Sequence, residues 1–284
     1  MYSTMQLKWD TTITTLQRMN TSKVLLVEHG ADGILQLTLN RPAELNAWTY
    51  ELEASFFAAL DSAAADASVR AVIVTGAGRG FCAGASMSLL GDVPDSRPDR
   101  SVRRRLCELA EYPKPLIAAI NGAAAGIGFA LAISCDLRIC AETSVLTTSF
   151  AKLGLVAEHG VAWILPQLVG RAHALDLLLS GRTVRGAEAE AMGLVNRSVP
   201  DGEALLAARN YAANLIASAA PSSWATIKRQ LLDANELTLS AAYEQAADLM
   251  DSALAAADHR EGAQAFRDKR RPQFAPLAQT AWRT

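Results

Sequence analysis

The sequence predicts an α/β fold in which a largely parallel sheet fills the first half of the chain and helices make up its end. Short apolar runs that stop at glycine alternate with segments of helical periodicity up to about residue 160. Beyond that point, apolar residues recur mostly at spacings of three and four. Strands that alternate with helices imply βαβ units, so we expect mostly parallel pairing.

The individual elements follow from local patterns. Residues 24–40 hold two apolar runs around a turn-rich break and predict a β-hairpin. Residues 49–67 predict a helix with Thr49 as N-cap. The remaining expected elements are a buried strand at 69–78, a loop-rich segment at 79–98, a helix at 99–111, a buried strand at 114–122, a helix at 126–136 and two short strands within 137–148.

Glycines at predicted helix ends and changes in composition indicate how the chain is divided. Gly170, Gly181 and Gly193 each follow an apolar helical stretch and are expected at helix C-termini. We expect residues 1–22 to form a flexible N-terminal extension, because they lack the apolar stretch of a secretory signal. Residues 23–200 are expected to form the core and residues 201–284 a C-terminal helical region.

Composition excludes several classes of function. The 284 residues carry a net charge of −2, so no basic excess supports nucleic-acid binding. No apolar run approaches the roughly 20 residues of a membrane-spanning helix. The four cysteines form no CxxC pair and the four histidines have no metal-ligand spacing. We therefore expect no metal and no membrane, and a reducing, cytoplasmic setting.

Familiar nucleotide and hydrolase motifs are absent. The glycines of 75–84 do not form G-x-G-x-x-G, and no helix follows at once, so a dinucleotide site is not expected. The end of this segment, at 80–85, and a second segment, at 121–128, are glycine-rich junctions that each follow a predicted buried strand. Their free N–H groups can hold a developing oxyanion, although tight turns with close packing would need the same small residues.

At these junctions the sequence resembles the enoyl-CoA hydratase/isomerase (crotonase) family. Asn40-Arg41-Pro42 with Asn46-Ala47 resembles the start of that family's pattern, and the segment 75–85 is similar to its first oxyanion loop. The segments 114–142, 153–182, 189–199 and 266–274 resemble its later parts, in order. The resemblance covers about residues 23 to 274.

The resemblance implies a crotonase-like spiral of ββα units with a C-terminal helical trimerisation region, so that a homo-trimer or hexamer is expected. It implies an acyl-CoA thioester substrate and no other cofactor, because the substrate itself carries the CoA. The backbone N–H groups of Ala85 and Ile127 would form the oxyanion hole. The positions that match CoA contacts in the family are Arg41, Ala83, Ala85, Met87, Phe266 and Lys269, of which Phe266 and Lys269 equally suit packing and a solvated charge.

The sequence departs from the family's hydratases at both catalytic glutamates. The matching positions hold Ala130 and Phe150, neither of which transfers a proton. A third acidic position, used by some isomerases of the family, holds Glu158. We therefore expect Glu158 to be the catalytic acid/base, although a carboxylate in the first turn of the next helix needs no other role. His159 would orient Glu158, act as an alternative base, or face outward.

Three functions remain open on the sequence. The one favoured is a Δ3-Δ2-enoyl-CoA isomerase that uses a single carboxylate and stabilises a thioester enolate. The second is an enoyl-CoA hydratase or another enolate chemistry, such as C–C hydrolysis. The third is a non-catalytic acyl-CoA-binding member, suggested by the loss of both usual glutamates.

Overall fold

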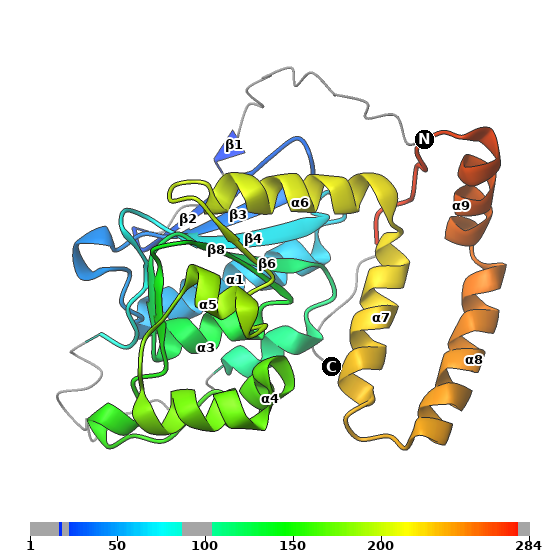
Figure 1. Cartoon of the computed structure of the whole chain (residues 1–284). Helices are drawn as coiled ribbons and strands as arrows, with labels where there is room; N and C mark the ends of the chain where they lie inside the picture. Colours follow the sequence, from blue (N-terminus) through cyan, green and yellow to red (C-terminus); the bar gives the residue numbers. More distant parts are fainter. Residues whose placement is uncertain (1–16, 19–22, 87–103, 278–284) are drawn as a thin grey trace, which may run out of the picture.

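The computed structural model describes residues 17–18, 23–86 and 104–277, and in this part the chain forms two sheets wrapped by helices (Figure 1). The larger sheet has the order β1-β2-β3-β4-β6-β8-β11 and the smaller one β10-β9-β7-β5. The strands of the larger sheet are β1 Gln17–Arg18, β2 Leu25–His29, β3 Ile34–Leu39, β4 Ala71–Gly76, β6 Leu116–Ile120, β8 Leu137–Ala141 and β11 Arg197–Val199. Those of the smaller sheet are β5 Gly80–Cys82, β7 Ala123–Ala125, β9 Val145–Thr147 and β10 Val184–Arg185.

The larger sheet is parallel from β3 onward, as the alternation of elements predicts. Before β3 it contains the expected antiparallel hairpin β2–β3, with β1 antiparallel beside β2. Both of its faces are covered. Ala71 and Ile73 of β4 pack toward α6 (Ala204–Ser218), while Val72 and Val74 join the core on the other face. Burial on both sides explains why these strands are continuous apolar runs rather than alternating ones.

Helices cover these faces and continue the chain. They are η1 Pro42–Glu44, α1 Tyr50–Ala65, η2 Leu106–Glu111, α3 Ile127–Ser134, η3 Ala151–Leu153, α4 Val161–Ser180, α5 Gly186–Ala191, α6, α7 Pro221–Asp233, α8 Leu239–Ala255 and α9 Ala257–Asp268. Thr49 caps α1 as predicted, since its hydroxyl accepts a hydrogen bond from the Leu52 N–H at 3.2 Å. The three glycines predicted at helix ends all have positive φ, and α4 breaks at Gly170.

Two local predictions were wrong in part. The segment expected to be loop-rich contains the strand β5, which is only three residues long and pairs with β7. Such a short strand has too few residues to show a period of two. The helix predicted over 99–111 is a 3-10 helix, η2, from Leu106 to Glu111, and residues 99–103 lie outside the described part.

Helices α7, α8 and α9 stand beside the core in Figure 1 rather than against the sheets. α7 is joined to the core through Lys228, whose Nζ donates to Asp136 Oδ2 at 2.7 Å and to the Lys114 carbonyl at 3.2 Å. Within the described residues, apolar side chains remain exposed along these helices. They are Ile227, Leu231, Leu239, Tyr243, Met250, Leu254 and Phe266.

A close backbone approach joins β5 of the smaller sheet to α3. A Cβ atom on Gly128 would lie 2.0 Å from the Cys82 carbonyl oxygen, a distance that no real contact allows. Gly84 has φ +106°, and a Cβ atom there would lie 3.0 Å from the Ala125 carbonyl oxygen. The small residues of both junctions are therefore required for the backbones to meet.

We expect Gly128→Ala to destabilise the protein by about 3 kcal/mol, because α3 must move away from β5 to admit one methyl group. Gly262→Ala is the matched control, also within a helix. The nearest atom there is Phe274 Cζ at 3.6 Å, an ordinary contact. Helix propensity should then stabilise the control by about 0.5–1 kcal/mol. Urea unfolding of both variants measures the difference, and equal shifts would contradict the packing argument.

Candidate active site

A cavity of about 320 Å³ opens where the two glycine-rich junctions meet. It is lined by Ala83, Gly84, Ala85, Ala125, Gly126, Ile127, Thr148, Ser149, Phe150, Lys152, Leu153, Leu155 and Glu158. Larger hollows of about 550 and 490 Å³ lie on the surface of α9 and beside α6. Neither of them contains a glycine-rich junction, so the smaller cavity is the candidate active site.

The N–H group of Ala85 is left free by the way its strand pairs. Trp48 and Ala85 form an isolated parallel bridge whose hydrogen bonds run from the Trp48 N–H to Gly84 O (2.7 Å) and from the Ser86 N–H to Trp48 O (2.9 Å). Successive N–H groups of an extended chain point in opposite directions, so the Ala85 N–H points away from Trp48.

The N–H group of Ile127 is left free by a helix start. Gly126 has φ 52° and donates to the Thr147 carbonyl at 3.1 Å, after which Ile127 begins α3. The first N–H groups of a helix have no acceptor within the helix. Among the described residues, neither Ala85 N–H nor Ile127 N–H has an acceptor, and both residues line the cavity. This pair can hold a negatively charged oxygen.

Two asparagines fix the first junction. Buried Asn46 donates to the carbonyls of Ala77 (2.9 Å) and Gly80 (2.8 Å) and accepts from the Arg41 N–H at 2.8 Å. Asn121 accepts from the Gly76 N–H at 3.1 Å, and its amide also donates to carbonyls of the same turn. In the sequence, Asn46 was recognised only as part of a motif, with no role of its own. The available signal was its amide side chain, which can bind backbone groups that a glycine-rich turn leaves unpaired.

The expected CoA-contacting residues are dispersed in a single chain. Ala83 and Ala85 line the cavity. The Arg41 guanidinium donates hydrogen bonds to the Ala47 carbonyl (2.5 Å) and to Glu44 Oε1 (2.7 Å), so it stabilises its own loop. Met87 lies outside the described residues. The Phe266 side chain is 86% exposed on α9 and Lys269 ends that helix, so neither lines the cavity of its own chain.

Glu158 is the one carboxylate among the described residues that line the cavity. It comes from the segment just before α4, and its side chain is about half exposed, at 47%. The wall near it is apolar and includes the buried ring of Phe150 with Leu153 and Leu155. Ala130, the other position where family hydratases have glutamate, is buried within α3. Among the described residues, one acid therefore faces the cavity.

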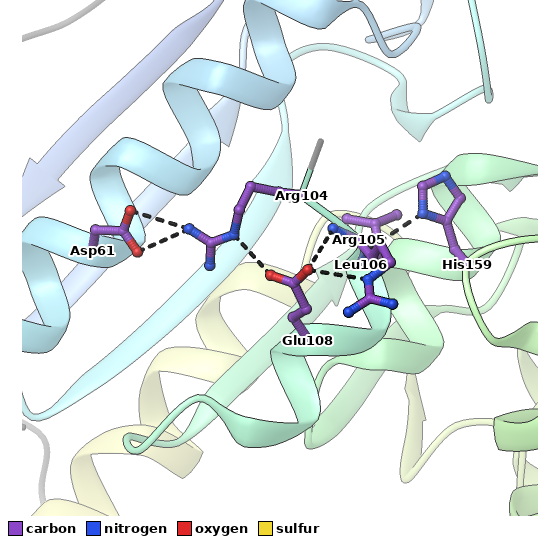
Figure 2. A network of polar contacts seen from close by, with 6 residues as sticks. All are labelled: Asp61, Arg104, Arg105, Leu106, Glu108 and His159. Carbon is purple, nitrogen blue, oxygen red and sulfur yellow. Dashed lines mark hydrogen bonds and ion pairs between the residues drawn. The ribbon is translucent and has the colours of Figure 1, made fainter. Parts of the chain in front are cut away.

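His159 lies behind Glu158 and does not line the cavity. Its backbone has φ 52°, which is uncommon for a residue with a side chain. Its ring is 9% exposed, and Nδ1 accepts a hydrogen bond from the Leu106 N–H at 3.4 Å (Figure 2). Nε2 lies 4.0 Å from Glu158 Oε2. Among the earlier alternatives, an outward-facing ring is therefore wrong, because its surroundings bury it.

Within the described residues, no helix is long and apolar enough to cross a membrane. The same residues contain no group of three or more His, Cys, Asp or Glu side chains that could hold a metal ion.

The α/β fold, with a cavity where two glycine-rich junctions meet, defines the class of protein, and comparison with known proteins identifies its family. Residues 29–276 match the family described as enoyl-CoA hydratase/isomerase. The chain is 35% identical to a 1,2-epoxyphenylacetyl-CoA isomerase of Escherichia coli K12, over 88% of this chain and 97% of the relative. The crystal structure of an enoyl-CoA hydratase from Polaromonas sp. JS666 superimposes with TM-score 0.80 at 32% identity, covering 91% of this chain and 99% of that one.

A further solved structure, an enoyl-CoA hydratase from Mycobacterium tuberculosis H37Rv, has TM-score 0.79 and 30% identity and covers 91% of this chain and 100% of that one. The chain therefore belongs to the enoyl-CoA hydratase/isomerase family. The crotonase-like α/β fold expected from the sequence is confirmed. Enzymes of this family generally act on CoA thioesters.

We expect Asn46→Ala to cost about 2–4 kcal/mol of stability, because it leaves buried carbonyls and an N–H group without partners. The first junction would also loosen, which should lower kcat/KM. Asn40→Ala is the matched control, since Asn40 makes one exposed hydrogen bond, to the Lys23 carbonyl at 3.0 Å. Urea unfolding and steady-state kinetics measure both. An unfolding midpoint unchanged by Asn46→Ala would contradict the assigned role.

We expect the native thiols to react slowly with Ellman's reagent at pH 8. Burial raises the pKa of Cys82, Cys135 and Cys140 to about 12 each, so little thiolate forms, and burial also raises the pKa of half-buried Cys107. All four thiols are free and should react at once in guanidinium chloride. Rapid labelling of more than one thiol in the native protein would contradict this burial.

Proposed function

We propose that this enzyme is a Δ3-Δ2-enoyl-CoA isomerase in which Glu158 is the single acid/base. The observation that carries the proposal is the pairing of two free N–H groups, at Ala85 and Ile127, with one carboxylate in an otherwise largely apolar cavity. The isomerase name of the Escherichia coli relative is consistent with this reaction class.

The reaction needs one proton removed and one returned. The Glu158 carboxylate takes a proton from C2 of the 3-enoyl-CoA, and the electron pair moves onto the thioester oxygen as a dienolate. The N–H groups of Ala85 and Ile127 stabilise that oxygen. The protonated Glu158 then delivers the same proton to C4, which leaves the double bond between C2 and C3. The product has the same atoms as the substrate, and the reaction consumes no water or cofactor.

Hydration would require a water molecule held and activated beside the double bond. The two positions where family hydratases have glutamate hold Ala130 and Phe150, whose side chains have no group that accepts a proton. The apolar wall of Phe150, Leu153 and Leu155 suits an acyl chain better than an ordered water. Hydratase activity is the second candidate, because several relatives carry that name.

We further propose that the chain works as a homo-trimer or hexamer. The exposed apolar residues of α7, α8 and α9 support an interface between copies, since such side chains are costly to leave in water. In that assembly, Phe266 and Lys269 would contribute to CoA binding at a neighbouring subunit, with Arg41, Ala83 and Met87 contributing within the chain. The free thiols support a reducing, cytoplasmic setting.

We expect Glu158→Gln to lower kcat for isomerisation of a 3-enoyl-CoA by about 10²–10⁴-fold, because the amide has the same shape and transfers no proton. Binding of the CoA ester should persist, since the two N–H groups are unchanged. The rate is followed by absorbance of the conjugated 2-enoyl-CoA, and the product is checked by mass. A product with the mass of one added water would indicate hydration instead.

Glu236→Gln is the control for the loss of one negative charge, because Glu236 is exposed and lies outside the cavity lining. It should leave turnover unchanged. Full isomerase activity in Glu158→Gln would overturn the assignment. Tight binding of CoA esters with no turnover of either 2-enoyl-CoA or 3-enoyl-CoA by the wild type would support the non-catalytic alternative.

A further inference from the structure

The conformation of His159 is held from outside the cavity. A residue with a side chain prefers negative φ, so φ 52° at His159 is kept only because surrounding contacts require it. One contact of the ring is with the Leu106 N–H, which donates to Nδ1. An imidazole nitrogen that accepts a hydrogen bond carries no hydrogen, so in the neutral ring the hydrogen sits on Nε2. That nitrogen is the one 4.0 Å from Glu158 Oε2.

Leu106 presents its N–H because it is the first residue of η2. The start of η2 is held by Glu108, two residues further on. Glu108 Oε1 accepts from the Arg105 N–H at 3.1 Å and from Arg105 Nε at 3.3 Å, which closes the helix start as a cap. The direction of the Leu106 N–H therefore depends on where the Glu108 carboxylate lies.

The Glu108 carboxylate is in turn held by Arg104, as Figure 2 shows. Arg104 Nε donates to Glu108 Oε2 at 2.8 Å, and Arg104 NH1 reaches both oxygens of Asp61 on α1 at 3.2 Å. The guanidinium also lies 4.4 Å above the ring of Phe57. Burial opposes ionisation of Glu108, but the hydrogen bonds from Arg104 and Arg105 lower its pKa below the usual value. Glu108 is thus a fixed anion, 13% exposed.

We propose that Glu108 is a positioning residue, which fixes the Nε2–H tautomer and the orientation of His159 through the Leu106 N–H, and that His159 thereby orients Glu158. Glu108 is not among the described residues that line the cavity, and the path to Glu158 runs through this chain of contacts. The inference rests on the proposed function for its kinetic consequence. The tautomer of His159 is independent of that function.

The first test is nitrogen NMR of the protein labelled with ¹⁵N-histidine, without substrate and at a pH where the rings are neutral. His159 is assigned among the four histidines by the loss of its signals in His159→Gln. We expect the wild-type shifts of an acceptor Nδ1 and a hydrogen-bearing Nε2. In Glu108→Ala the two shifts should move toward each other as the tautomers exchange. Identical shifts in the wild type and the variant would overturn the proposal, whatever the activity of the enzyme.

The second test is kinetic. Glu108→Ala should lower kcat for the 3-enoyl-CoA by about tenfold and change KM by less than about twofold, because a displaced Glu158 affects proton transfer rather than binding. In a His159→Ala background the same substitution should change kcat by less than about twofold, since both act along one path. An undiminished effect in that background would assign Glu108 a merely structural role and overturn the proposal.

Two further variants keep the test decisive. Glu111→Gln removes a carboxylate from the same 3-10 helix at an exposed position and should leave both the shifts and kcat unchanged. Glu108→Gln keeps an oxygen that can accept from the Arg105 N–H, so it should recover most of the tautomer signature that Glu108→Ala loses. If Glu108→Ala does not fold, the wild-type shifts decide, because a hydrogen-bearing Nδ1 on His159 would overturn the proposal. No recovery in Glu108→Gln would argue against the cap as the cause.

Discussion

The close backbone approach between β5 and α3 is the constraint on which the rest of the site depends. Gly128 lies so near the Cys82 carbonyl that no side chain fits between them. This contact brings the start of α3 beside the end of β5, and with it the N–H group of Ile127 beside that of Ala85. An oxyanion hole made of backbone groups needs no special side chains, but it needs two chain segments fixed at close range. The small residues allow the two segments to approach this closely.

The cost of this arrangement is a turn rich in unpaired carbonyls, and the two asparagines offset it. Asn46 and Asn121 approach the 76–80 turn from different parts of the chain and between them bind its carbonyls and the Gly76 N–H. Buried polar groups of the backbone are costly when they lack partners. The same side chains that satisfy them also fix the turn in space. The same asparagine side chains therefore provide hydrogen-bond partners for the backbone and make the site rigid.

Much of the fold could be predicted because its signals are local. The parallel strands of the large sheet are buried on both faces and appear as apolar runs, and Thr49 and the helix-ending glycines mark element boundaries. The three-residue strand β5 shows no period, and η2 is too short to be distinguished from a longer helix. Ala85 and Ile127 were assigned through the family pattern, and the structure supplied the reason why their N–H groups are free.

Other parts of the site could not be predicted because they join segments far apart in the sequence. Leu106 contacts His159 over 53 positions, and Asp61 contacts Arg104 over 43. A main-chain donor such as the Leu106 N–H has no side-chain signature at all. Phe266 and Lys269 are the opposite case. The family pattern predicts that they contact CoA, but they do not line the cavity of their own chain. Contacts of both kinds become visible only in three dimensions.

A cavity with one carboxylate restricts the chemistry more than one with two. A lone acid that both removes and returns a proton must reach C2 and C4 of the substrate, so its position matters more than its strength. Glu158 is half exposed on a segment without regular structure, where its own backbone cannot fix it. Its neighbour His159, held at a positive φ and bonded to the start of η2, supplies the missing rigidity. A mechanism with Glu158 as its single acid, as proposed, thus depends on the groups that hold this carboxylate in place.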